Sequence, residues 1–380
     1  MNDVVIAGIG ITPFGYYPNL PNYSLAAPAV LGAVKDALIE WTDVQAAFCG
    51  SVYQGTGSGH QVIRELGLTG IPIVNIENAC SSGTSAFRLG YQAVQSGQYD
   101  TVAVLGFEKM PTGPIPSTAF RSWQLKMGFN VQPANYALEA MEYMNKYGIH
   151  IDDISFVTIN NRRQGVLNPN ARFRSEVTME QINSSRMIST PFRLFHCAPI
   201  ADGAVCLILT KAGKEKNPSR SVKVKAATLC SGKYGDAFYQ NGLMSSVKFP
   251  PAEGFVQQSA REAYELSGFG PEDIDVIQVY DSMAAGQLWD LENLGFCPLG
   301  ESPKYMREGY FSLGGTKPAN TDGGMMSRGH PLGATGAAQI FEIVTQLRGE
   351  AGQRQVEKAK IGLTHAMGAG PNSSVVILQK

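Results

Sequence analysis

The amino-acid sequence contains one cysteine whose position suits nucleophilic chemistry. Cys80 follows the apolar segment IPIVNIE and precedes SSGTSAFRLGYQAV, so we expect it at the first turn of a helix. A thiol there lies near the positive end of the helix dipole and near free backbone N–H groups, both of which favour the thiolate. Ser81, Ser82 and Gly83 are small enough to let a substrate approach. Position alone is equally consistent with a buried structural cysteine, a common role for a free thiol.

Two histidines stand in glycine-rich segments that can present their side chains to a site. His330 lies in GGMMSRGHPLGATGAAQIF, and the proline after it holds its backbone extended, so its ring can point out of the loop. His365 lies in GLTHAMGAG, between an apolar strand and a glycine turn. The glycines around His330 match neither a Walker nor a Rossmann nucleotide-binding pattern.

Alternating strands and helices must position these side chains. Residues 71–76 and 101–105 are predicted strands, and apolar residues at helical spacing between them predict a helix over 86–94. In one sheet this order implies parallel strands joined by a right-handed crossover. The same order returns later, with a predicted strand at 274–280 and predicted helices at 283–294 and 334–347. The sequence therefore predicts an α/β fold.

The two halves of the chain end in similar segments. ADGAVCLILTK (201–211) and GPNSSVVILQK (370–380) are each a glycine-containing turn that leads into an apolar strand. We therefore predict an internal duplication, with an N-terminal half at 1–215 and a C-terminal half at 216–380. Residues 111–191 differ in character, and we expect them to form an insertion over one face of the first half. Its arginines are either a solvated surface or a phosphate site, and they are Arg162, Arg163, Arg172, Arg174 and Arg186.

Composition excludes several classes of protein. The 380 residues are 44% hydrophobic and 17% charged, which excludes intrinsic disorder. A formal net charge of −1 provides no general field for nucleic acid or an anionic membrane, and no apolar run is long enough to span a bilayer. The amino terminus has Asp3 and no basic segment, so it is not a secretion signal, and we expect a cytoplasmic protein. Six scattered cysteines without a Cys-x-x-Cys pair predict neither a disulfide framework nor a metal site.

Five motifs together resemble those of the thiolase superfamily, and most closely its sterol-carrier-protein-type and lipid-transfer-protein-like branch. In chain order they are NACSSG (78–83), NNRRQGVLNP (160–169), HCAPIADGA (196–204), RGHPLGATGAA (328–338) and the terminal GLTHAMGAGPN. The resemblance runs over nearly the whole chain. It implies a thiolase fold with duplicated βαβαβαββ halves, a five-layered αβαβα arrangement and an inserted loop domain, here about 111–191.

The resemblance also implies roles for individual residues. Cys80 would be the nucleophile that takes up the acyl group, and His330 the base that deprotonates it. The backbone N–H groups of Cys80 and Gly368 would form an oxyanion hole for the tetrahedral intermediate. No bound cofactor or metal is implied, and a coenzyme A thioester is the expected substrate.

The sequence departs from the family where a second acid/base is expected. Biosynthetic and degradative thiolases carry a cysteine in a late Cys-x-Gly motif, where this chain has Thr364-His365-Ala366. The sterol-carrier branch carries it in His-Asp-Cys-Phe, where this chain has Tyr280-Asp281-Ser282-Met283. Tyr280 is therefore the candidate polar group opposite Cys80. A phenol can donate a hydrogen bond or a proton, but it is a poor base for the weakly acidic acetyl-CoA carbon.

Three functions follow from this pattern. The first is acyl transfer through Cys80 to a carbon that is already nucleophilic, such as a carbon of a phenolic ring. The thiolase-like subunit of phloroglucinol C-acetyltransferases is an example. Plain thiolysis remains open if His365 or Asp281 supplies a base. The second is retro-aldol cleavage of a β-hydroxyacyl-CoA promoted by Tyr280, as in the thiolase-like aldolases of steroid side-chain degradation. The third is a non-catalytic scaffold, against which the retained Cys80 and His330 argue.

The resemblance also implies partners. Thiolases dimerise through strands next to the nucleophile, so we expect at least a homodimer with its contact around Thr101 to Leu105. Relatives that lack the second cysteine work with a small companion that contains an OB-fold and a zinc ribbon. This chain contains no such segment, so a companion would be a separate polypeptide alongside the acyl donor and the small-molecule acceptor.

Overall fold

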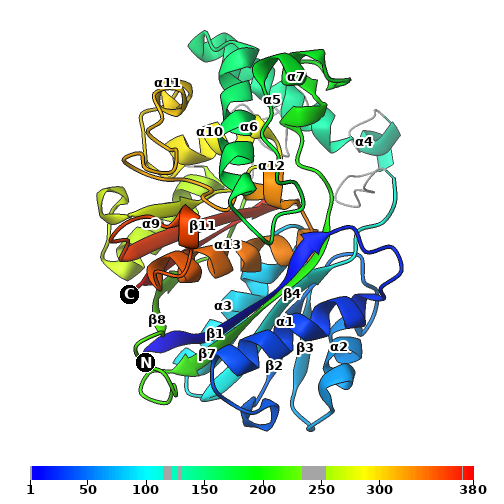
Figure 1. The fold of residues 1–380 in the computed structure, drawn as a ribbon, viewed down its shortest axis with the longest axis vertical. Helices are drawn as coiled ribbons and strands as arrows, with labels where there is room; N and C mark the ends of the chain where they lie inside the picture. The colour runs from blue at the N-terminus through cyan, green and yellow to red at the C-terminus, as the bar shows by residue number, and fades with distance from the viewer. Residues whose placement is uncertain (1, 114–121, 127–130, 233–253, 370) are drawn as a thin grey trace.

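The computed structural model describes residues 2–113, 122–126, 131–232, 254–369 and 371–380 (Figure 1). The strands before residue 215 are β1 (Val4–Gly15), β2 (Ala47–Gly50), β3 (Ile73–Ile76), β4 (Thr101–Glu108) and β7 (Asp202–Lys211). Those after it are β8 (Val222–Ala227), β9 (Cys230–Ser231), β10 (Val276–Gln278), β11 (Ile361–Gly368) and β12 (Asn372–Gln379). They form a mixed sheet in the order β10-β11-β12-β8-β1-β7-β4-β2-β3, and β9 pairs with β12.

The sheet repeats one strand order in its two halves. The first half reads β3-β2-β4-β7-β1, with β2, β3 and β4 parallel and β7 antiparallel to β4 and β1. The second half reads β10-β11-β12-β8, and a parallel bridge from Ile277 to Ala319 occupies the place that β3 has in the first half. A short antiparallel pairing of β1 with β8 joins the halves. Between them the chain passes from Lys211, at the end of β7, to Val222, at the start of β8.

Helices form three layers around the two half-sheets. α3 (Ser82–Gln95) and α13 (Leu332–Leu347) lie between them, where α13 contacts β4 on one side and β11 on the other. α1 (Asn22–Asp36) and α2 (Ser58–Leu66) cover the outer face of the first half, and α9 (Phe255–Ser267) and α10 (Ala284–Asn293) cover that of the second. α13 is buried around its whole circumference, as expected for an Ala- and Gly-rich helix in a central layer. The predicted five-layered αβαβα thiolase fold is thus the fold of this chain.

The predicted insertion contains four helices, α4 (Ser122–Lys126), α5 (Gln132–Tyr147), α6 (Ile151–Val166) and α7 (Met179–Ser184), among its described residues. It also contains β5 (Met187–Ser189), which forms a hairpin with β6 (Phe192–Arg193) just beyond it. Residues 114–121 and 127–130 of the insertion lie outside the described chain. The expectation that it covers the first half is wrong. α6 packs on α10, α11 (Ser302–Arg307) and α12 (Gly324–Arg328) of the second half (Figure 1). Asn161 of α6 donates to Gln287 at 2.7 Å and Gln164 to the carbonyl of Ala319 at 2.9 Å. Buried amides need such partners, and the second half supplies them.

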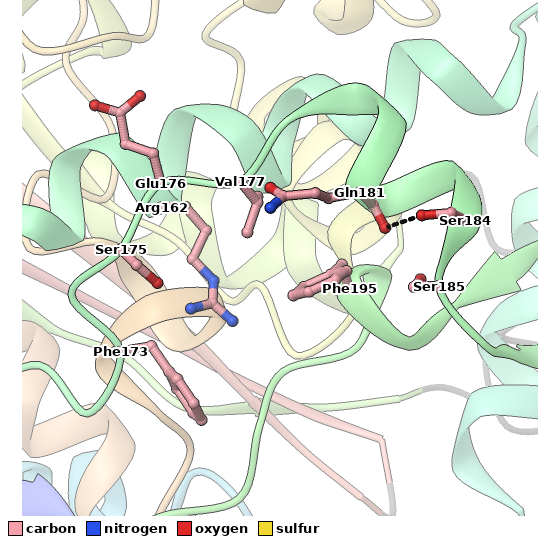
Figure 2. Close-up of a pocket in the computed structure, with 9 residues that line it drawn as sticks. All are labelled: Arg162, Phe173, Ser175, Glu176, Val177, Gln181, Ser184, Ser185 and Phe195. Carbon is pink, nitrogen blue, oxygen red and sulfur yellow. Dashed lines mark hydrogen bonds between the residues drawn. The ribbon is translucent and has the colours of Figure 1, made fainter.

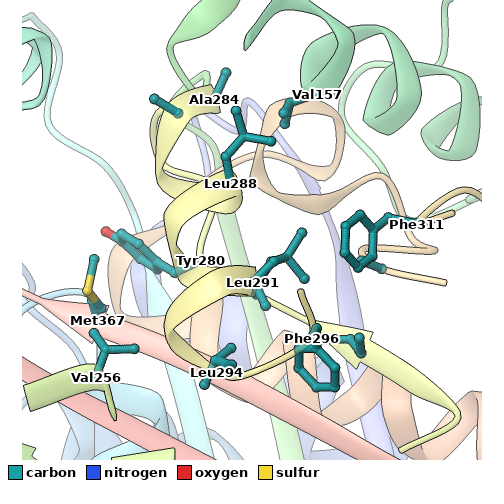
Figure 3. Close-up of a cluster of buried hydrophobic side chains, with 14 of the residues drawn as sticks. Val157, Val256, Tyr280, Ala284, Leu288, Leu291, Leu294, Phe296, Phe311 and Met367 are labelled. Carbon is teal, nitrogen blue, oxygen red and sulfur yellow. The ribbon is translucent and has the colours of Figure 1, made fainter. Parts of the chain in front are cut away.

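A hydrophobic cluster fixes α10 between the insertion and the second half-sheet. Leu288, Leu291 and Leu294 of α10 belong to it, and Val157 of α6 joins them from the insertion (Figure 3). Tyr280 lies at the edge of the same cluster, on the side of Met367 (Figure 3). The packing of α10 therefore also holds the tyrosine that the sequence singled out.

Several predicted element boundaries shift. The strand predicted at 71–76 begins at Ile73, the strand predicted at 101–105 continues to Glu108, and the strand predicted at 274–280 covers only Val276–Gln278. β4 is hydrogen-bonded on both sides, to β2 and to β7, so its backbone cannot pair with a second chain. The predicted dimer contact around Thr101 to Leu105 is therefore wrong. β3 is the edge of this part of the sheet.

Candidate active site

Cys80 lies in a tight turn between β3 and α3. The helix begins at Ser82 with Ser81 as its N-cap, so Cys80 stands just before the first turn and not within it. Ala79 adopts a left-handed conformation with φ of 48°, which is unfavourable for an alanine and must be held by its surroundings. The Ser82 hydroxyl does this by donating to the Ala79 carbonyl at 2.6 Å and accepting from the Asn78 N–H at 2.8 Å. The turn therefore fixes the direction of the partly exposed thiol.

The resting thiol is protonated. Burial raises the pKa of Cys80 to about 11, a hydrogen bond with Tyr280 opposes this rise, and the Glu108 carboxylate adds to it. A backbone hydrogen bond at Cys80 does favour the thiolate, as expected, but desolvation penalises the charged form more strongly. Ionisation must be coupled to a neighbouring base.

His330 is held as a neutral base between α12 and α13. Its backbone N–H donates to the Pro199 carbonyl at 3.0 Å, which fixes the position of the residue. Its ring Nδ1 lies 2.7 Å from the Thr335 hydroxyl. Thr335 donates its own proton to the Pro331 carbonyl at 2.9 Å, so its oxygen accepts from Nδ1–H. This leaves Nε2 as an acceptor. Burial, and to a smaller extent Arg328, lowers the pKa of His330 to about 3.

Tyr280 links these two groups. Its hydroxyl lies 3.3 Å from Nε2 of His330 and is hydrogen-bonded to the thiol of Cys80. The tyrosine and histidine rings meet edge to face, with centroids 5.7 Å apart. Burial raises the pKa of Tyr280 well above its ordinary value, so the phenol stays protonated. The structure thus brings Cys80, Tyr280 and His330 together, with the tyrosine in contact with both of the others.

Gly368 ends β11 directly against the turn that carries Cys80. A Cβ at this position would lie 2.4 Å from the Asn78 carbonyl oxygen, so only glycine allows the approach. Asn372, at the start of β12, fastens the two segments together. Its Nδ2 donates to Oδ1 of Asn78 at 3.0 Å and its Oδ1 accepts from the Ser81 hydroxyl. Asn372 is the last residue of the GLTHAMGAGPN motif, but the sequence alone gave it no role in the site.

The structure places His365 and Asp281 in other roles. Nδ1 of His365 lies 3.3 Å from Asp290, its Nε2 lies 3.1 Å from the Ser373 hydroxyl, and all three side chains are buried. Asp281 accepts from the N–H groups of Met325 at 2.8 Å and Met326 at 3.1 Å, and so caps α12. Asn161 donates to the same carboxylate at 2.8 Å. Burial raises the pKa of Asp281 to about 6. Both groups are engaged within the protein and do not join the Tyr280 contacts.

Two further features support the site: Glu108, which the sequence patterns did not single out, and the segment 197–200 of the HCAPIADGA motif. Glu108, buried at the end of β4, accepts from the N–H groups of Val52, Tyr53 and Gly333, each at 2.9 Å, and so ties the start of α13 to the first half. The segment from Cys197 to Ile200 contacts the loops that carry Tyr280 and His330. Its Ala198 N–H donates to the Ser282 carbonyl at 2.9 Å, and Ile200 forms a bridge with His330.

The described part of the chain has neither a metal-binding cluster nor a membrane-spanning helix. No group of three or more His, Cys, Asp or Glu side chains there is arranged to hold a metal ion. Every helix in that part is too short or too polar to cross a lipid bilayer. The six cysteines are free thiols.

Family models match most of the chain. Residues 4–190 match the thiolase N-terminal domain, and residues 244–380 match the domain described as thiolase C-terminal domain-like. The chain belongs to the thiolase family. The acetyl-CoA acetyltransferase of Methanothermobacter thermautotrophicus is 36% identical over 99% of both chains. Sterol carrier protein 2 of Bos taurus is 35% identical over all of this chain and 72% of its own length, which confirms the predicted branch.

Three further comparisons give one more relative and two solved structures similar to this chain. The benzoylsuccinyl-CoA thiolase subunit BbsB of Thauera aromatica is 33% identical over 97% of this chain and 95% of its own. The Ltp2-ChsH2(DUF35) aldolase structure superposes with a TM-score of 0.87 at 26% identity, over 100% of this chain and 98% of that chain. Human mitochondrial 3-ketoacyl-CoA thiolase superposes with a TM-score of 0.74 at 16% identity, over 100% and 99% of the two chains, and shows the shared fold.

Proposed function

We propose that this protein is a thiolase-like C-acyltransferase that carries an acyl group on Cys80, from a coenzyme A thioester to a small-molecule acceptor. The observation that carries the proposal is the Tyr280 hydroxyl in contact with both the Cys80 thiol and Nε2 of His330. Relatives named as an acetyl-CoA acetyltransferase and a benzoylsuccinyl-CoA thiolase subunit support transfer chemistry of this type.

The first half-reaction uses the tyrosine as a proton relay. As the Cys80 sulfur attacks the thioester carbonyl, the thiol proton passes to the Tyr280 oxygen and the phenol proton passes to Nε2 of His330. The imidazolium then returns its proton to the departing coenzyme A sulfur. This path suits a thiol with a pKa of about 11 and a histidine with a pKa of about 3, because no charged pair persists in the buried resting site.

Backbone donors stabilise the intermediate. The N–H groups of Cys80 and Gly368 are the proposed oxyanion hole, and the contact of Gly368 with the Cys80 turn supports this assignment. Asn372 holds both segments in register. An oxyanion that develops here meets donors that are already oriented.

The second half-reaction constrains the acceptor. Tyr280 stays protonated, His365 is engaged by Asp290, and Asp281 caps a helix. None of these three is a strong base free to remove a proton from the α-carbon of acetyl-CoA. We therefore propose an acceptor carbon that is already nucleophilic, such as an electron-rich phenolic ring.

A second candidate is retro-aldol cleavage of a β-hydroxyacyl-CoA. It is favoured by the structural similarity to the Ltp2-ChsH2(DUF35) aldolase and by the position of Tyr280, whose phenol can exchange a proton with the β-hydroxyl group. This chemistry needs no acyl-cysteine, so the retained Cys80 and His330 argue for transfer instead.

Intact-protein mass spectrometry separates the two functions. After incubation with a panel of acyl-CoA esters, acyl transfer requires a mass increase that maps to Cys80 and is lost in Cys80→Ala. Cleavage of a β-hydroxyacyl-CoA by both the wild type and Cys80→Ala, without any adduct, would establish the aldolase in its place.

A companion subunit belongs to the same proposal. One structural neighbour is a complex with a DUF35 protein, and one relative is named as a subunit. We propose that this chain also works with a separate small subunit that carries the OB-fold and zinc ribbon.

A further inference from the structure

A second pocket lies in the insertion, apart from the Cys80 site. It has a volume of about 390 Å³, opens to the surface and is lined by α6, α7 and the segments that follow them, all within residues 162–195 (Figure 2). Cys80, Tyr280 and His330 are not among the residues that line it. Its ligand would therefore not compete directly with acylation of the cysteine.

Arg162 points into this pocket from α6 (Figure 2). Only 6% of its surface is exposed, and its guanidinium lies against two phenyl rings, 4.7 Å from the centroid of Phe173 and 5.7 Å from that of Phe195. Its Nε is buried and has no hydrogen-bond partner. Burying a charged group without a hydrogen-bonded partner is costly, so this arrangement calls for one.

Other buried arginines of the chain have acidic partners. Arg328 pairs with Asp322, and Arg354 pairs with Glu342 at 2.9 Å. Arg162 takes part in none of the ion pairs found among the described residues. Its positive charge therefore faces the pocket without an ion-pair partner among the described residues.

We propose that this pocket binds a small organic carboxylate with an apolar or aromatic body. The planar guanidinium can donate two parallel hydrogen bonds to a carboxylate, and Phe173, Phe195 and Val177 provide apolar walls. A single cation balances a single negative charge. The carboxylate of Glu176, which also lines the pocket, lies 3.9 Å from Arg163 and is turned away from the Arg162 guanidinium (Figure 2).

Calorimetry with benzoate as the probe tests the assignment. Wild-type protein is expected to bind one benzoate, and Arg162→Gln should weaken this binding by about 10- to 100-fold through loss of charge-assisted hydrogen bonds. Arg186→Gln is the matched control, since Arg186 is an exposed arginine of the same insertion that does not line the pocket, and it should bind as the wild type does. Circular dichroism and acylation of Cys80 check that each variant is folded.

A second measurement needs no variant. Wild-type crystals soaked with 4-bromobenzoate should show the anomalous bromine signal in the pocket, with the carboxylate on Arg162. No benzoate binding, equal binding by Arg162→Gln, or bromine only at other sites would overturn the proposal. Inorganic phosphate that binds as tightly as benzoate, and is lost in Arg162→Gln, would overturn the choice of a carboxylate.

Discussion

Tyr280 acts on the ionisation of Cys80 in the opposite direction to burial. Its hydrogen bond lowers the pKa of a thiol that burial has raised to about 11. Tyr280→Phe removes this hydrogen bond, so the pKa should rise further and the thiolate fraction should fall at every pH below it. We expect alkylation of Cys80 by iodoacetamide to slow by about 2- to 10-fold near pH 8, with its profile displaced to higher pH.

Tyr264→Phe is the control for this prediction. Tyr264 is partly buried and donates to the Leu294 carbonyl at 2.7 Å, away from the thiol. Its removal should leave the alkylation profile unchanged. A profile for Tyr280→Phe that coincides with the wild type would separate the tyrosine from the ionisation of Cys80.

The two glycine-loop histidines should respond differently to substitution. His330→Ala removes the proposed proton acceptor, and the rate of acyl-cysteine formation should fall by about 100- to 10,000-fold. His365→Ala removes a buried partner of Asp290 and Ser373, so it should lower the free energy of unfolding by about 1–3 kcal/mol while folded protein still acylates. Urea unfolding and acylation measured by mass spectrometry test the pair. Equal loss of acylation in both variants would return His365 to the mechanism.

Part of this residue-level chemistry could be predicted from the sequence. The Cys80 turn is local, because a strand, a cysteine, small residues and a helix follow one another in the chain. Tyr280 and His330 were identified by motif, but their contact joins residues 50 positions apart and no local pattern predicts its distance. The raised pKa of the thiol could not be predicted from the sequence, because desolvation depends on the whole surrounding fold.

At the scale of elements, Gly368 tests how closely β11 must approach the Cys80 turn. In Gly368→Ala the new Cβ would meet the Asn78 carbonyl at 2.4 Å, and backbone must move to relieve the contact. We expect about 1–3 kcal/mol of destabilisation. A displaced oxyanion donor should also slow acylation by about 100- to 1000-fold.

A matched glycine substitution shows whether this effect is specific. Gly32 lies in α1, where a Cβ would be 3.5 Å from the Cα of Gly10 and makes ordinary contact. Gly32→Ala should leave acylation unchanged and alter stability by less than about 1 kcal/mol. If Gly368→Ala acylated as fast as Gly32→Ala, the proposed oxyanion hole would have to be placed elsewhere.

The elements also show where sequence patterns stop being informative. Hydrophobic periodicity located the strands and helices of both halves, because each buries one face or its whole surface. It did not place the insertion, since α6 is held to the second half by buried amides such as Asn161 and Gln164, and amides carry no periodic signal. The dimer contact was expected at β4 because strand order within a sheet is set by tertiary packing, and no local pattern shows which strand lies at the edge.

At the scale of the whole molecule, β3 is the edge of the first half-sheet and the place where a second copy can pair. Its Val74 is 40% exposed in the single chain. An exposed apolar residue on an edge strand favours pairing with another chain. We expect a homodimer through this edge, and Val74→Lys should convert it to a monomer by placing a charge in the contact. Leu31→Lys, on the exposed side of α1, is the control and should remain dimeric. Light scattering after gel filtration measures both, and a Val74→Lys dimer would contradict the β3 contact.

The companion subunit gives the last prediction. Because the proposed site has no second strong base, substrate positioning must account for more of the rate, and a subunit that binds the coenzyme A or acceptor portion would supply it. The protein purified alone should therefore acylate Cys80 slowly or be poorly soluble, and co-expression with a neighbouring OB-fold and zinc-ribbon protein should improve both properties. Pull-down and acylation rates with and without that protein measure the effect. A homodimer of this chain alone with full transfer activity would exclude an obligate companion, while the acyl-cysteine mechanism would stand, since it depends only on Cys80, Tyr280 and His330.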